Sequence, residues 1–461
     1  MAQPTTRLQV SGHRFLARRM EHALVRGDPR LLDDPLRAQT LSFSVGVVLA
    51  VVGLAVCAVL AFVRPADAIG DAPLVVVRDS GAMYVRIDGV MHPVFNLASA
   101  RLILGAAAEA RVVSQRAVDN AELGPQMGIP GAPQQISPPL TKQESGWTVC
   151  DDERSGTTVL AGPLDDAASA ADRSVLVSPR GASAAVTYLL HGGWRARVDL
   201  RHAAVVRALR LDGVVPQQVS PLLLDAIPEA PAIEPPRIPA LGAAGPLTMS
   251  RYAVGTVVQV PAADGVDHFV VLPDGLQRVG EVAADLIRYT DSRSGAEIPT
   301  VSAADIGAVP VTNILPVATF PDRANLSRDP VICARWRRQS GRSGSYTAVL
   351  VAAELPAAAR SVPLAQADGA GPAIDAVSVP AGRSVFVRSV SLTGSGAGAG
   401  SLFLVTAAGL RFGIRDAETA AALGITASAE PAPWPVLSSL PPGPELSRPA
   451  ASVVSDAVGA P

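Results

Sequence analysis

The chain has 461 residues, enough for several domains of about 100–200 residues each. Its 39 basic and 41 acidic side chains nearly cancel and leave a net charge of −2. Neither the charge nor any clustering of arginine indicates a nucleic-acid-binding protein, so we expect no nucleic-acid partner. Glycine and proline number 40 each and aromatic residues make up 4%, a composition that favours short strands and turns over a helical bundle.

The first 40 residues form an arginine-rich tail with a net charge of +3, so the remainder of the chain carries −5. Ser11 is a suitable N-cap for a helix running to Val25, and Gly27 is suited to end it. Apolar residues share one face of this helix and arginines line another. Such a helix is suited to lipid headgroups or to a cytosolic partner. The simpler alternative is a partly ordered tail with solvated arginines.

A stretch of 23 residues without a charge, Leu41–Val63, follows the tail. About 20 apolar residues in a helix cross a bilayer, so we predict one transmembrane helix. Asp34 is a good N-cap and Pro35 a good first residue, and Arg64-Pro65 ends the helix. Arginines in the N-terminal flank favour a cytoplasmic N-terminus and an extracytoplasmic body. A cleaved signal peptide is the alternative, which the length and position of the stretch disfavour.

Three cysteines are present, and each has a simple interpretation. Cys57 lies in the predicted span, where it acts as a small apolar residue. Cys150 and Cys333 are the only cysteines of the body. An extracytoplasmic body permits oxidation, so the two can pair, whereas two buried free thiols are the alternative.

The body contains a degenerate repeat that occurs four times. Each copy has an apolar run, a glycine followed at once by an apolar residue, a second apolar run and a helix-like stretch. A glycine between two strands suits a hairpin turn with positive φ, so each unit is predicted to be strand–turn–strand–helix. The four glycines are Gly89, Gly193, Gly275 and Gly409.

The spacing of the repeats leaves two insertions. One contains Trp147 and Cys150, and the other contains Cys333 and Trp336. A bond between the cysteines would enclose the second and third repeats, which suggests a split central domain. The chain ends in a proline-dense segment, for which we expect extended structure without helix, docked through Trp434, Leu437 and Leu440.

These expectations together predict an α+β protein with one transmembrane helix and an elongated extracytoplasmic body. The predicted domains are, in chain order, a cytosolic tail at 1–40, the transmembrane helix at 41–63, repeat 1 at 74–120, the first part of the central domain at 121–180, repeat 2 at 181–240, repeat 3 at 241–290, the second part of the central domain at 291–375, repeat 4 at 376–430 and a proline-rich segment docking on the body at 431–461.

The sequence shows no motif for catalysis or for binding of a metal or cofactor. It lacks CxxC, HExxH, GxSxG and GxGxxG patterns. A Walker A loop needs a lysine after a glycine-rich turn, and the only lysine, Lys142, lies in Leu140-Thr141-Lys142-Gln143. We therefore predict no cofactor and no catalytic residue.

Several segments resemble the EccB family of the type VII (ESX) secretion machinery of actinobacteria, and the resemblance runs nearly from end to end. The tail LQVSGHRFLARRMEHALVRGD (8–28) and HPVFNLASARLILG (92–105) are the most specific. The other matching segments are LLDDPLRAQ (31–39), GIPGAPQ (128–134), WTVC (147–150), YAVGTVVQV (252–260), PVICARW (330–336), LAQADGAGP (364–372) and LPPGPELS (440–447).

The resemblance implies a subunit of the inner (cell) membrane with one span, a cytosolic N-terminus and an extracytoplasmic rod. It further implies four repeats that resemble a cell-wall-binding fold, flanking a central β domain with a Cys150–Cys333 disulfide. Implied partners are EccC, EccD and EccE subunits, with a mycosin protease and peptidoglycan as further candidates. The tail residues expected to contact partners are Arg14, Phe15, Arg18, Arg19, Asp34 and Pro35.

The resulting interpretation is a structural core subunit of the secretion complex. One alternative is a membrane-anchored peptidoglycan-binding envelope protein outside any complex. Another is a nucleotide hydrolase, because some family members are labelled ATPases, although this sequence shows no recognised nucleotide site.

Overall fold

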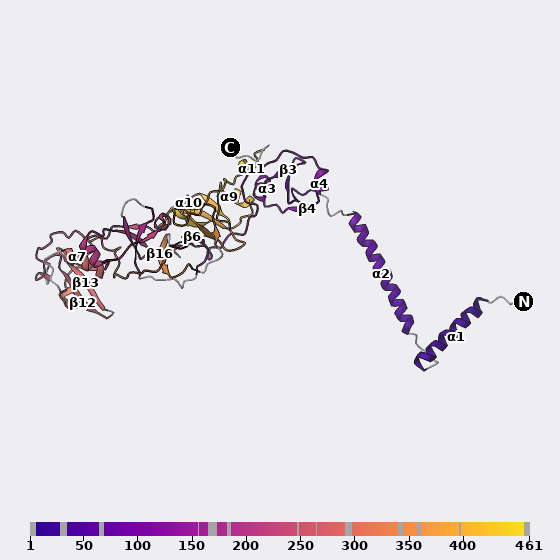
Figure 1. The fold of residues 1–461 in the computed structure, drawn as a ribbon, viewed down its shortest axis with the longest axis horizontal. Coiled ribbons are helices and arrows are strands. Elements are labelled where there is room, and N and C mark those ends of the chain that lie inside the picture. Colours follow the sequence, from indigo (N-terminus) through magenta and orange to yellow (C-terminus); the bar gives the residue numbers. More distant parts are fainter. Residues whose placement is uncertain are drawn as a thin grey trace.

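The structure is a computed structural model in which the chain forms two N-terminal helices and a long body (Figure 1). It describes residues 6–27, 35–63, 69–154, 156–164, 173–181, 186–246, 249–263, 265–290, 297–339, 344–356, 361–395 and 398–455.

Helix α1 (Arg7–Arg26) begins earlier than the sequence analysis predicted. The Thr6 side chain accepts the Gln9 N–H while the Gln9 side chain accepts the Thr6 N–H, which is a complete capping box. The prediction of Ser11 as the N-cap was therefore wrong, because these reciprocal bonds satisfy the helix start one turn upstream. Gly27 ends the helix in a left-handed conformation, φ 70°, as predicted.

Helix α2 (Pro35–Val63) has the predicted bounds. Its segment Gln39–Leu60 is long and apolar enough to cross a membrane, and none of that segment is buried against the remainder of the protein. The predicted cap Asp34 and the predicted stop Arg64-Pro65 lie outside the described residues.

The four predicted strand–turn–strand–helix units are present. Three of the turn glycines have positive φ, with values of 91° at Gly89, 84° at Gly193 and 81° at Gly409. Gly275 differs, since it lies inside a strand rather than at the turn and has no positive φ. A Cβ there would overlap the Pro310 carbonyl oxygen, so close backbone approach explains this glycine.

Each repeat contains more elements than the predicted strand–turn–strand–helix unit and follows one plan of seven elements. A strand precedes the hairpin and pairs antiparallel with its first strand. After the helix, the chain returns parallel to that preceding strand, forms a short second helix, and ends parallel to the last hairpin strand. The returning segments therefore cover both edges of each three-stranded sheet, which leaves few unpaired backbone groups.

The repeats have the following elements. Repeat 1 consists of β1 (Leu74–Val77), β2 (Met83–Ile87), β3 (Val90–Val94), α3 (Leu97–Leu104), β4 (Arg111–Val113), α4 (Gln115–Asp119) and bridges at Leu123 and Met127. Repeat 2 consists of β7 (Val175–Pro179), β8 (Thr187–His191), β9 (Trp194–Val198), α5 (Ala203–Ala208), β10 (Gln217–Val219), α6 (Pro221–Asp225) and β11 (Glu229–Ala230).

Repeats 3 and 4 match them element by element. Repeat 3 consists of β12 (Val257–Ala262), β13 (Gly265–Leu272), β14 (Gly275–Val279), α7 (Glu281–Thr290), a bridge at Thr300, α8 (Ala303–Gly307) and a bridge at Val311. Repeat 4 consists of β19 (Val385–Val390), β20 (Leu402–Val405), β21 (Arg411–Ile414), α9 (Ala417–Ala422), β22 (Glu430–Pro433), α10 (Trp434–Ser439) and bridges at Pro442 and Leu446.

The central sheet is assembled from two distant parts of the chain, as predicted. Its strand order is β16-β15-β5-β6-β18-β17. The strands are β5 (Trp147–Asp152), β6 (Gly156–Ala161), β15 (Val331–Arg338), β16 (Ser345–Ala352), β17 (Val362–Pro363) and β18 (Ala376–Ser378).

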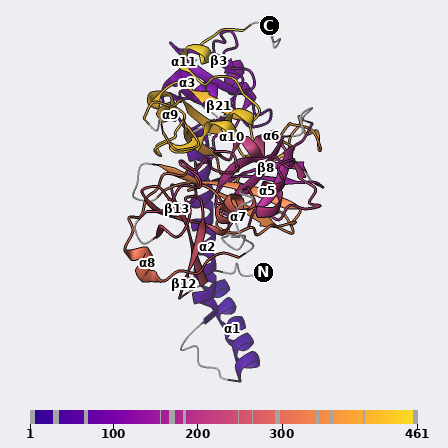
Figure 2. The ribbon, with the colours of Figure 1, turned by 90° about the vertical axis from the view of Figure 1, so that its left-hand side faces the viewer.

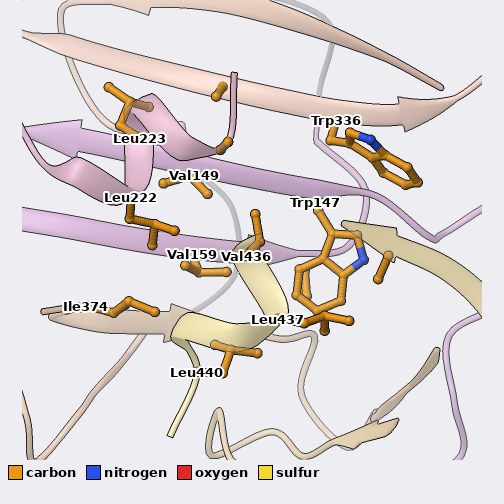
Figure 3. Close-up of a cluster of buried hydrophobic side chains, with 14 of the residues drawn as sticks. Trp147, Val149, Val159, Leu222, Leu223, Trp336, Ile374, Val436, Leu437 and Leu440 are labelled. Atoms are coloured by element: carbon orange, nitrogen blue, oxygen red, sulfur yellow. The ribbon is translucent and has the colours of Figure 1, made fainter. Parts of the chain in front are cut away.

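Shared hydrophobic cores set the order of these units along the body. Repeats 1 and 4 share one core, and repeats 2 and 3 share another. The largest core joins the central sheet to repeats 2 and 4, and side chains from β5, α6 and α10 meet in it (Figure 3). The cores therefore link repeat 1 to repeat 4, repeat 4 to both the central domain and repeat 2, and repeat 2 to repeat 3. Figures 1 and 2 both place α3 beside α9, and Figure 1 shows α7 at the far end of the body.

The C-terminal segment completes repeat 4 and returns to repeat 1. The expectation that it contains no helix was wrong, because Trp434–Ser439 forms α10 with Pro435 in its first turn, where a missing N–H costs nothing. Leu437 and Leu440 are buried as expected, whereas Trp434 is 45% exposed. Helix α11 (Arg448–Ala451) packs on α3. The boundaries between the domains stay a prediction.

Candidate functional site

Helix α1 presents an apolar surface that no described part of the protein covers. The exposed fractions of Phe15, Leu16 and Met20 are 57%, 56% and 64%. Exposing several large apolar side chains on one face of a helix is unfavourable in water, so the helix is suited to a partner or a lipid surface.

The predicted contact residues of the tail are only partly described. Arg14, Arg18 and Arg19 are exposed, and they make no ion pair with any described residue. Pro35 begins α2, but its side chain and the whole of Asp34 lie outside the described residues. The structure therefore brings Arg14, Phe15, Arg18 and Arg19 onto one free helix and does not place Asp34.

The disulfide between Cys150 and Cys333 is present in the central sheet. The two residues are direct partners on adjacent antiparallel strands, β5 and β15, and both are buried. They are 183 positions apart, and the loop between them contains repeats 2 and 3. The bond thus holds together the two halves of the central domain at the base of that arm.

A buried ion pair forms the joint between the central domain and repeat 2. Arg180 Nη2 lies 2.6 Å from Asp151 Oδ1, with side-chain exposures of only 10% and 2%. The other Asp151 oxygen accepts the backbone N–H of Ser220, the N-cap of α6. On the neighbouring edge, a Cβ at Gly193 would overlap the Thr347 carbonyl oxygen of β16. Sequence reasoning missed this joint, because its residues are distant in the chain and show no common pattern.

Two of the family-like segments form buried hydrogen bonds that fix nearby loops. In HPVFNLASARLILG, the buried Asn96 accepts the Ser99 N–H at 2.8 Å and donates to the Ile129 carbonyl oxygen at 2.7 Å. In the loop after LAQADGAGP, Asp375 accepts the N–H groups of Thr157 at 2.7 Å and Gly369 at 2.6 Å. These buried polar groups fix loops on the sheets rather than forming a reactive cluster.

A cavity of about 1040 Å³ lies between repeats 2 and 3. It is lined by the hairpin turn of repeat 2, with His191 and Trp194, and by Asp267, His268 and Arg278 of repeat 3. Arg278 pairs with Asp267 at 2.6 Å. Among the described residues, no group of histidine, cysteine, aspartate or glutamate is placed to hold a metal ion.

The buried His191 predicts weakening of the fold in acid. Burial lowers its pKa to about 4 from an ordinary 6.5. Because the unfolded chain binds this proton more readily, the contribution of His191 is complete above pH 6.5 and is lost as the pH falls toward 4. We expect His191→Gln to reduce the loss of thermal stability between pH 7 and pH 4, measured by circular dichroism. An unchanged pH profile would contradict this assignment.

Comparison with known proteins identifies the family. The model of the family described as type VII secretion system ESX-1, transport TM domain B, matches residues 2–460. The ESX-3 secretion system ATPase EccB3 of Mycolicibacterium smegmatis is 38% identical over 98% of this chain and 91% of that protein. The ESX-5 secretion system ATPase EccB5 of Mycobacterium marinum is 33% identical over 98% of this chain and 94% of that protein.

Solved structures of ESX complexes indicate the same family. A chain of an intact ESX-5 inner membrane complex superposes with a TM-score of 0.72 at 30% identity, covering 100% of this chain and 98% of that one. The EccB3 dimer from the ESX-3 core complex gives a TM-score of 0.71 at 32% identity, covering 83% of this chain and all of that one. The fold, the length and the sequence agree throughout, and this protein belongs to the EccB family of type VII (ESX) secretion proteins.

Proposed function

We propose that this chain is a structural core subunit of a type VII secretion complex in the inner membrane. One observation carries the proposal: in the described part of the chain, the exposed apolar helix α2 lies between the amphipathic helix α1 and a long body joined by successive hydrophobic cores. Such a chain can anchor in the bilayer, bind on one side of it and brace an assembly on the other.

The N-terminus lies in the cytoplasm and the body outside it in this proposal. The arginine-rich flank supports that orientation through the positive-inside rule. The disulfide of the central sheet supports it independently, since such bonds persist in oxidising compartments. EccC-, EccD- and EccE-type subunits are the proposed partners, and a mycosin protease and peptidoglycan are further candidates outside the membrane.

Purification from membranes in mild detergent tests the proposal. We expect the chain to co-purify in an assembly of megadalton size with other membrane subunits. A chain that elutes alone, with intact α1 and α2, would support the envelope-protein alternative instead.

The tail helix gives a prediction of its own. Replacing Arg18 and Arg19 with glutamate reverses two exposed charges on α1 without touching the body. We expect the subunit to leave the assembly while its body keeps its thermal stability, because charge reversal opposes docking on a complementary partner surface. Size-exclusion chromatography checks this, and Arg415→Glu, on the body, is the matched control. Normal assembly of the tail variant would refute docking through these residues.

We also expect the purified chain not to hydrolyse ATP above background. Phosphoryl transfer needs cationic groups and backbone N–H groups aimed at the phosphates. Lys142, the only lysine, is exposed and does not follow a glycine-rich turn that opens a helix. Steady-state hydrolysis by the full chain, free of motor subunits, measures this, with Lys142→Ala as the comparison. Turnover that is abolished by one substitution in this chain would establish an enzyme instead.

A further inference from the structure

Arg411 of repeat 4 lies over two aromatic rings and has no carboxylate partner among the described residues. Its guanidinium carbon lies 5.0 Å from the ring centre of Phe403 and 5.4 Å from that of Trp434. Phe403 is directly opposite Gly413 on the neighbouring strand. The Arg411 side chain makes no hydrogen bond or ion pair with any described residue, and its Nε is buried without an acceptor.

The equivalent arginine of repeat 2, Arg195, has the carboxylate partners that Arg411 lacks among the described residues. Arg195 is two residues after the turn glycine of repeat 2, as Arg411 is in repeat 4, and it lies 5.7 Å from the ring centre of Tyr188. Arg195, however, forms ion pairs with Asp225, at the end of α6, and with Glu229, at distances of 3.3 and 3.4 Å. The repeat thus builds an arginine site stacked on an aromatic ring and completes it with carboxylates.

Neither position that carries one of these carboxylates in repeat 2 carries an acid in repeat 4, and Glu445 of the closing segment lies beside Gly413 without an ion pair to Arg411. Glu229 is the parallel bridge partner of Arg195, and the parallel bridge partner of Arg411 is Pro442. Asp225 ends α6, whereas the corresponding helix α10 ends in Ser439. Repeat 4 keeps the arginine and the aromatic platform and lacks both acids.

A partly buried guanidinium without an anion is costly, and its planar donors match a carboxylate in bidentate geometry. Burial lowers the pKa of Arg411, the direction expected for a cation without a counter-charge. Trp434 adds an exposed ring, 5.8 Å from Phe403, that suits an apolar group next to the anion. We propose that Arg411 and Trp434 form a docking site for an acidic side chain or terminal carboxylate of a partner polypeptide, which replaces the acids of repeat 2.

The chemical part of the proposal is tested on the isolated full chain in detergent. Benzoate, which combines a carboxylate with a ring, should quench the fluorescence of Trp434, and benzamide should not. Arg411→Gln should weaken benzoate binding by about tenfold, the effect of about 1.4 kcal/mol from one charged hydrogen-bonding group. Arg415→Gln removes the same charge just beyond the same strand and should change nothing. Equal responses to benzoate and benzamide, or unchanged binding by Arg411→Gln, would overturn the site.

The source of the carboxylate rests on the proposed function and is tested in the assembled complex. A photoreactive residue at Ser438, which is exposed one turn after Trp434 on α10, should cross-link to a neighbouring subunit. Arg411→Gln should abolish the cross-link. Pro442→Glu should also abolish it, since it supplies the missing carboxylate within the chain, while leaving thermal stability equal or higher.

The binding experiment tests the site and the cross-linking experiment tests its occupant, so their outcomes can be distinguished. Benzoate binding without an Arg411-dependent cross-link would leave a site for small carboxylates and overturn the partner polypeptide. A chain that never enters an assembly would contradict the proposed function, while benzoate binding would still report on the site itself.

Discussion

Replacing Cys150 and Cys333 with serine should lower the free energy of unfolding by as much as about 5 kcal/mol. On the chain-entropy model, the bond restricts an unfolded loop of 183 residues, and the figure is an upper one because native strain is ignored. The ladder between β5 and β15 remains, so the variant should still fold in the absence of denaturant. Urea unfolding followed by intrinsic fluorescence measures the shift in midpoint.

Cys57→Ser provides the matched control for this experiment. It also removes a cysteine, but one that is exposed in α2 and has no bond. We expect its unfolding midpoint to equal that of the unchanged chain. If the variant without Cys150 and Cys333 had the same unfolding midpoint as the unchanged chain, the bond would not restrict the unfolded state. Mass spectrometry that finds both thiols free in the unchanged chain would show that the bond does not form.

Asp151→Ala should destabilise the joint between the central domain and repeat 2 by about 3–5 kcal/mol. The substitution leaves the Arg180 charge buried without a partner and deprives the Ser220 N–H of its acceptor. Because this joint carries the arm of repeats 2 and 3, hydrogen exchange should increase in β10 and α6 before it increases in repeat 1. Differential scanning calorimetry and exchange mass spectrometry provide the two measurements.

Two further variants separate the buried charge from the loss of a surface contact. Asp151→Ala combined with Arg180→Met should recover part of the stability, since no unpaired charge remains. Arg201→Ala breaks the exposed pair with Asp199, whose N–O distance is 3.0 Å, and should leave the midpoint unchanged. Additive losses in the double variant would mean that the ion pair does not couple the two domains.

The sequence alone determined the features that depend on local pattern. An uncharged run of 23 residues is sufficient to predict α2, because the bilayer requires only length and apolarity. Gly27 ends α1 and three glycines form the hairpin turns because glycine adopts positive φ without steric cost. The cysteines could be paired because the predicted orientation places them in an oxidising compartment.

The tertiary structure decided whatever depends on contacts between distant residues. The second half of each repeat uses strands and bridges so short, such as β11 at Glu229–Ala230, that no alternating pattern develops. The helix α10 forms within a proline-dense segment because Leu437 is buried in a core shared with β5 and α6.

The arrangement of the repeats along the body and the ion pairing of their arginines could also be determined only from the tertiary structure. Repeat 4 lies beside repeat 1 because apolar faces far apart in the chain share one core, which periodicity within either segment cannot reveal. Arg195 and Arg411 look alike in the sequence, each following a glycine and an apolar residue. Only the parallel bridges show that Arg195 faces Glu229 while Arg411 faces Pro442, because the register between separate segments determines which charges meet.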